Sequence, residues 1–146
     1  MDATETRMTE RLVLGAILWA PLRNEKVGPL CLKALDYAPQ FWQEPLYGKV
    51  AKAVRMAIRH SGTADQVSTY RYLSRTDDAV NGDEFRALCQ LCSSEQDAPM
   101  SMAEHHAKDL VALYAGLAIV NRIGEAWEMA KNNPNKAHII LQSLKK

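Results

Sequence analysis

The residues best suited to chemistry in this sequence are two cysteines in the run Cys89-Gln90-Leu91-Cys92, followed by the pair His105-His106. This cysteine spacing is typical of zinc sites, in which thiolates and imidazoles complete a set of four ligands. Only one such cysteine pair is present, and adjacent histidines diverge around a helix, so they do not easily reach one ion. Cysteines three residues apart also share a helix face, where they pack as small hydrophobic groups. We favour this packing interpretation and expect no metal and no cofactor.

Nucleotide chemistry has no sequence signal here. The seven glycines never form the glycine-rich spacing, followed by Lys-Ser or Lys-Thr, that cradles a triphosphate. No Ser/His/Asp or Cys/His set for nucleophilic catalysis stands out either. We therefore expect no catalytic residue in this chain and no hydrolysis of ATP by it.

Four arginines form the second chemical candidate, and they lie at four-residue spacing in two predicted helices: Arg55, Arg59, Arg71 and Arg75. Such residues can neutralise phosphates, so they are the candidate nucleic-acid contact. Alternatively, they offset a helix dipole and otherwise lie in solvent. The 18 Lys+Arg residues against 17 Asp+Glu leave a net charge of only +1, so direct DNA binding is expected to be weak or absent.

The composition is that of an ordinary globular domain. The chain has 146 residues, of which 47% are hydrophobic and 24% charged. The longest apolar stretch, residues 12–22, is about half of what a membrane span needs. Met1 is followed by Asp2 and Glu5, where a secretory signal would be basic, and the three cysteines agree with a reducing compartment. We expect a cytoplasmic protein with no membrane partner.

Glycines and prolines punctuate a sequence rich in helix-forming residues, and no segment alternates as a strand would. Pro45 suits the first position of a helix, and Gly62 is placed to end it. Apolar residues at helical spacing predict helices at about 9–20, 26–36, 45–61, 68–74 and 83–92. We therefore predict an all-α fold, in which residues 1–100 form a small orthogonal helical bundle.

Residues 101–146 predict a long helix and a short second arm. Ser101 and Glu104 have the spacing of a capping box, which indicates a helix start. No strong breaker follows for about thirty residues, roughly 45 Å of helix. The apolar stripe changes face along it, from the side of Leu110 and Tyr114 to the side of Ile123, so two packing partners are expected. The first partner is the bundle.

The second arm, residues 134–146, is expected to fold back on the long helix as a hairpin. With only about thirteen residues, roughly 20 Å of helix, it cannot cover the second apolar face. We expect another copy of the chain to cover that face, in a dimer or a higher oligomer. The predicted interface consists of Ile119, Val120, Ile123, Trp127, Ile139, Ile140 and Leu144.

Several segments share a pattern with one known family. They are residues 10–18 (ERLVLGAIL), Phe41 with Pro45, Tyr47 and 53–54, Gly62 with Asp65, Val67 and Leu73, and 104–111 (EHHAKDLV), continuing through Arg122 to Ala130. Their order resembles the N-terminal domain of bacterial replicative DNA helicases of the DnaB type. Residues 87–91 match only in part, and histidines 105 and 106 stand where that family has tyrosines. The ATPase motor domain of the family is absent from this chain.

The resemblance implies a small helical domain followed by a helical hairpin, which in that family forms a ring-shaped collar by hairpin pairing and docks the primase. That region supports unwinding without doing chemistry. We therefore hypothesise a non-catalytic protein-interaction and oligomerisation module of DNA replication, which associates with itself and with the helicase or primase of a primosome. The chain would be part of an ATP-dependent helicase only if a motor domain follows it. The alternative is a small helical DNA-binding or regulatory protein that uses a basic helix face.

Overall fold

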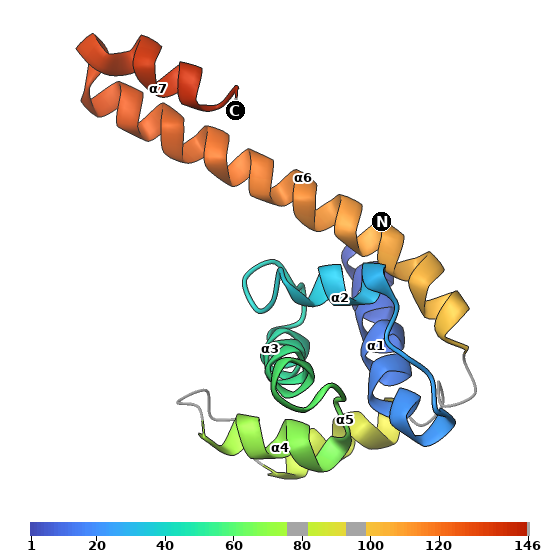
Figure 1. Ribbon diagram of the computed structural model, residues 1–146. Coiled ribbons are helices and arrows are strands. Elements are labelled where there is room, and N and C mark those ends of the chain that lie inside the picture. The colour runs from blue at the N-terminus through green and yellow to red at the C-terminus, as the bar shows by residue number, and fades with distance from the viewer. Residues whose placement is uncertain (76–81, 93–98, 146) are drawn as a thin grey trace. The chain divides into compact units, whose positions relative to one another are not determined.

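The computed structural model describes residues 1–75, 82–92 and 99–145, apart from the side chains of residues 91 and 92. All regular structure in these ranges is helical, which confirms the predicted all-α class. The α-helices are α1 (Ala3–Trp19), α2 (Pro29–Leu35), α3 (Pro45–Ser61), α4 (Gln66–Arg75), α5 (Gly82–Cys92), α6 (Met100–Asn132) and α7 (Ala137–Ser143), shown in Figure 1. Two 3₁₀ turns, η1 (Ala20–Arg23) and η3 (Pro134–Lys136), precede α2 and α7.

The chain divides into two compact units, Met1–Ala112 and Leu113–Lys146, and α6 contributes to both. The domain boundary predicted from the sequence lies at residue 100. The first unit extends beyond that point because the first turns of α6 bury Ala103, Ala107 and Leu110 completely. The long helix is therefore an integral part of the first unit's core before it enters the second unit.

Helix α1 supplies the centre of the first unit. Its residues 13–18 are all buried, and it packs against α3 and α5. In Figure 1 α3 is seen almost end-on while α4 lies across the view, which is the steep crossing expected of an orthogonal bundle. Helix α1 begins six residues earlier than predicted, because Asp2 caps it by accepting a hydrogen bond of 2.8 Å from the amide of Glu5.

Local chemistry explains the bounds of α3 and the start of α4. Helix α3 begins at Pro45 and ends at Ser61, as predicted. Gly62 follows with φ +80°, a left-handed conformation that favours glycine, and donates its N–H to the carbonyl of Ile58 at 2.8 Å. Asp65 caps α4 by accepting from the amide of Ser68 at 2.7 Å. These two helices pack against each other in the first unit.

Glutamates from distant parts of the chain cap two other helix starts. The fully buried Glu10 of α1 accepts hydrogen bonds from the amides of Gln43 (2.7 Å) and Glu44 (3.2 Å), immediately before α3. Glu25 accepts from the amide of Met100, the first residue of α6, at 3.1 Å. A carboxylate at these positions satisfies orphan N–H groups and complements the helix dipole. These hydrogen bonds connect helices that are distant along the chain, and helix propensity alone does not predict such connections.

The capping box predicted at Ser101 and Glu104 is wrong. Helix α6 begins at Met100, and the amides of residues 102 and 103 bond to the carbonyl of Pro99, so Ser101 lies inside the first turn. Glu104 instead accepts from the amides of Leu30 (3.0 Å) and Cys31 (2.8 Å). Its carboxylate therefore caps α2, more than seventy residues earlier in the chain.

Gly28 makes room for this cap. A Cβ atom added at Gly28 would overlap Cδ of Glu104. We expect Gly28→Ala to displace the carboxylate and lower the free energy of unfolding by about 1–3 kcal/mol, because two amides lose a charged acceptor. Urea denaturation measures this. Gly116→Ala is the matched control: a Cβ there meets nothing within 4 Å, so it should be neutral or stabilise by up to ~1 kcal/mol. An unchanged stability for Gly28→Ala would contradict the capping role.

Candidate self-association surface

The second half of α6 leaves its apolar side chains in solvent. Tyr114 is fully buried, yet five large apolar residues later in α6 are between 53% and 65% exposed, and four of them share one side of the helix. Successive helix positions are 100° apart, so these four fall within roughly 100° of one another. They therefore form one contiguous apolar face, named here the α6 apolar face: Ile119, Val120, Ile123 and Trp127.

A short arm covers only part of the second unit. After α6 the chain reverses through η3, and α7 runs back along the last turns of α6 (Figure 1). Helix α7 has seven residues, about 10 Å of helix, so it is shorter than the arm predicted for residues 134–146. Its half-buried side chains are Ala137, Ile140 and Leu144, and Ala126 of α6 is 6% exposed. The hairpin thus has a narrow core of its own.

Five of the seven predicted interface residues are exposed: Ile119, Val120, Ile123, Trp127 and Ile139. The other two, Ile140 and Leu144, are half-buried on the inner side of α7. Met129 and Leu141 are also more than half exposed, and the sequence analysis did not include them. In the sequence, Met129 and Leu141 are apolar residues that lie outside the main apolar stripe of their helices, and that pattern could have identified them. They extend the exposed apolar area beyond the α6 apolar face.

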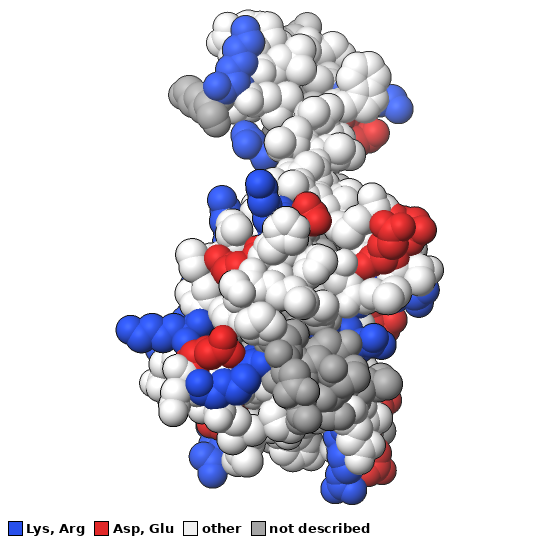
Figure 2. Space-filling model, turned by 90° about the vertical axis from the view of Figure 1, so that its right-hand side faces the viewer, with Lys and Arg blue, Asp and Glu red and all other residues white. Residues whose placement is uncertain are grey.

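A shallow groove lies beside the α6 apolar face: Val120 and Trp127 of that face line it, together with Asn121, Gly124, Glu125, Glu128 and Met129. Gly124 has open space where a side chain would stand. The uppermost part of the molecule in Figure 2, where α7 lies, is mostly white, with a few blue and red side chains among the uncharged atoms. The α6 apolar face offers exposed apolar area for a protein partner.

The four candidate arginines differ in their surroundings. Arg55 and Arg59 of α3 both approach Oδ1 of Asp36, at 2.8 and 3.5 Å, so a carboxylate offsets part of their charge. Arg71 and Arg75 are exposed on α4. On the face seen in Figure 2, basic and acidic side chains are interleaved, and no large area carries one sign.

The cysteines and histidines do not assemble a metal site within the described residues, where no group of three or more His, Cys, Asp or Glu could hold an ion. Cys89 is buried, and burial raises the pKa of its thiol to about 11, so the thiol stays protonated at neutral pH. The side chain of Cys92 lies outside the described residues. His105 is exposed and His106 half-buried, with ring centroids 5.5 Å apart in an edge-to-face arrangement.

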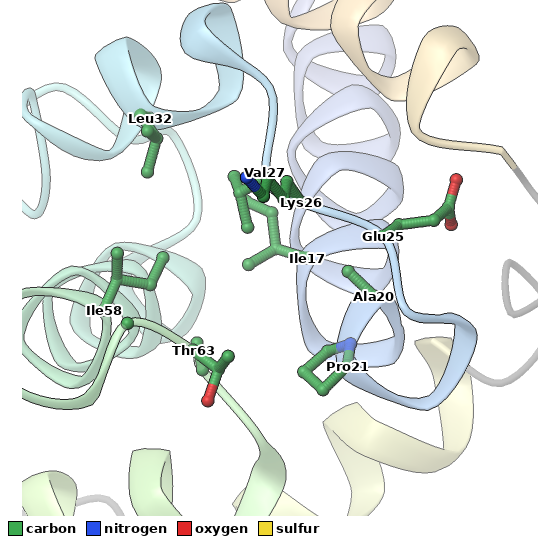
Figure 3. Close-up of a pocket in the computed structure, with 11 residues that line it drawn as sticks. Ile17, Ala20, Pro21, Glu25, Lys26, Val27, Leu32, Ile58 and Thr63 are labelled. Carbon is green, nitrogen blue, oxygen red and sulfur yellow. The ribbon is translucent and has the colours of Figure 1, made fainter.

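The first unit also contains a cavity of about 280 Å³ between α1, α2 and the end of α3. Figure 3 shows Ile17, Leu32 and Ile58 around it, whereas the side chain of Glu25 is directed away from the other labelled side chains. The carboxylate of Glu25 is instead used at the start of α6. Most of the side chains that line the cavity are apolar.

No protein-family model matches this chain, and comparisons with curated proteins and with solved structures find no significant match. In the part of the chain that the structure describes, no helix has the length and apolar character that crossing a membrane requires.

Proposed function

We propose that this chain is a non-catalytic interaction module of DNA replication, which associates with itself and with a replicative helicase or primase. The α6 apolar face is the main observation in support of self-association. Its four large side chains are more than half exposed, in a unit of only 34 residues. Isolated exposed apolar residues are common on soluble proteins, but contiguous ones mark an interaction surface.

The energetics favour a dimer of moderate strength. Burying an aliphatic or aromatic side chain is worth ~1.5–3 kcal/mol, and about 60% of that remains available at these sites. Four side chains on each of two copies then contribute roughly 7–14 kcal/mol, against an association cost of ~4–15 kcal/mol. Flanking contacts from Met129, Ile139 and Leu141 add to the favourable side. A micromolar dissociation constant corresponds to about −8 kcal/mol, which these ranges supply when the gain is near the upper end and the cost near the lower end, and we expect self-association of that strength.

A second copy of the chain is the proposed occupant because the face can pair with itself. In a symmetric dimer each copy presents the same surface, so both apolar faces are covered in one closed contact. A higher oligomer would follow if further apolar residues, such as Ile139 and Leu141, pair with other copies. The four residues of the α6 apolar face are uncharged. The same face on a second copy can therefore pack against them without any complementary charges.

The replication assignment is supported by the resemblance of the ordered segments described above to the N-terminal domain of DnaB-type helicases. A helical first unit followed by a helical hairpin is also the organisation that this resemblance implies. In that family the corresponding region contacts the primase and encloses no nucleotide site. The present chain accordingly would act through binding.

Size-exclusion chromatography with light scattering tests the replication assignment. The full chain, mixed at about 50 μM with a purified DnaB-type helicase or with a primase, is expected to elute in a complex with one of them. Bovine serum albumin in place of the helicase or primase is the control. If neither protein binds, the replication assignment fails, while self-association is judged separately by the oligomeric state of the chain alone.

Direct DNA binding is the second candidate, favoured by the exposure of Arg71 and Arg75. The ion pairs of Arg55 and Arg59 with Asp36 count against it. We expect a labelled DNA duplex to bind no more tightly than a nonspecific Kd of roughly 10⁻⁴–10⁻⁶ M at physiological salt. A nanomolar Kd with a steep salt dependence would make DNA binding the leading function.

A further inference from the structure

Helices α4 and α5 form a groove of about 530 Å³ in the first unit. Its wall and floor are apolar. Phe85 is 6% exposed and Cys89 is buried, while Val67 stands 65% exposed. The ring of Tyr70 stacks on Phe85 with centroids 5.8 Å apart and an interplanar angle of 23°. A large apolar side chain of a partner would find a preformed surface here.

Among the described residues, the two charged side chains that line this groove are both basic. Arg71 of α4 and Arg86 of α5 are exposed, and neither forms an ion pair with any other residue that the structure describes. Asp83 and Glu84 are exposed on α5 but do not line the groove. Two guanidinium groups beside an apolar surface are complementary to carboxylates, which they bind through paired hydrogen bonds.

We propose that the α4–α5 groove binds an acidic peptide segment of a partner protein that carries a large apolar side chain. The apolar side chain packs against Val67, Tyr70 and Phe85, and the peptide's carboxylates bind Arg71 and Arg86. The groove lies entirely within the unit Met1–Ala112, so this proposal does not depend on self-association through the second unit.

The aromatic pair argues against single-stranded nucleic acid as the occupant. Base stacking needs an open aromatic face. Phe85 is buried and covers one face of Tyr70, so Tyr70, 39% exposed, is the one ring of this pair that could stack on a base, whereas single-stranded nucleic acid is usually held by stacking successive bases. A peptide needs only the edges of these rings and the exposed Val67.

Selection from a phage-displayed library of random dodecapeptides on the immobilised full chain tests the proposal. Enriched peptides are expected to combine several Asp or Glu residues with a large apolar residue. A synthetic peptide of the enriched sequence should lose affinity ~10-fold or more for the variant R71E/R86E, because two charge-assisted contacts become repulsive. The variant R7E/K52E carries the same change in net charge at exposed positions outside the groove and should bind within about twofold of the wild type.

A second variant separates the apolar contact from the charges. Val67→Ser should weaken the same peptide several-fold, and circular dichroism should show the same helical content as the wild type, since Val67 is exposed. Failure to enrich any peptide, enrichment without acidic residues, or equal binding to R71E/R86E would each overturn the proposal. So would a labelled 12-nucleotide single strand that binds more tightly than the peptide and is lost in R71E/R86E.

Discussion

Ile123→Asp is expected to shift the protein from a dimer or higher oligomer towards a monomer. Ile123 lies at the centre of the α6 apolar face and is 53% exposed, so the substitution should not disturb the core of the first unit. A carboxylate there must be desolvated in any contact that buries the face, which costs several kcal/mol. We expect the apparent dimer dissociation constant to rise by at least ~100-fold, as measured by sedimentation equilibrium between about 1 and 100 μM.

Asn121→Asp is the matched control for this experiment. It adds the same charge two residues away, but at 100° per residue it lies roughly 160° around the helix from Ile123. Asn121 is exposed and lines the neighbouring groove but is not part of the α6 apolar face, so its substitution should leave the oligomeric state unchanged if that face is the contact. Both variants should keep the helical circular dichroism of the wild type. A wild-type chain that sediments as a monomer at about 100 μM would refute self-association through this face.

Loss of the Glu10 carboxylate is expected to produce the largest change in stability. Glu10 has no exposed surface, and its two oxygens accept the amides of Gln43 and Glu44. Glu10→Gln keeps the size but replaces one acceptor by an NH₂ group that faces an N–H. We expect a loss of about 2–4 kcal/mol in the free energy of unfolding, or roughly 10 °C in Tm. Differential scanning calorimetry and urea denaturation measure both quantities.

Glu5→Gln provides the comparison on the same helix. Glu5 is exposed, and its side chain is at the start of α1, so the same change should cost less than ~1 kcal/mol. Equal stabilities of the two variants would show that the start of α3 does not depend on Glu10. Glu10→Gln should also leave self-association intact, because its structural effect is confined to the first unit.

Local patterns predicted much of the helical structure. The segment between Pro45 and Gly62 was predicted correctly at both ends, because a proline and a left-handed glycine act through their own backbone. The buried side of α6 around Leu110 was predicted as well, since helical spacing places apolar residues on one face. The exposure of Ile123 and Trp127 agrees with the second stripe seen in the sequence, but exposure does not identify a partner.

Tertiary contacts decided which carboxylate caps which helix. Glu104 has the local spacing of a capping box with Ser101, yet it caps α2 through Leu30 and Cys31. Glu10 reads as a polar residue in an apolar segment, and its role depends on Gln43 and Glu44, more than thirty residues away.

Sequence by itself determined the helical segments and the faces along which they are apolar, because both follow from the chemistry of neighbouring residues. Only the tertiary structure decided the unit boundary, the pairing of Arg55 with Asp36 and the groove between α4 and α5. These features join residues that are distant along the chain. Their geometry depends on how whole helices pack, which local spacing does not encode.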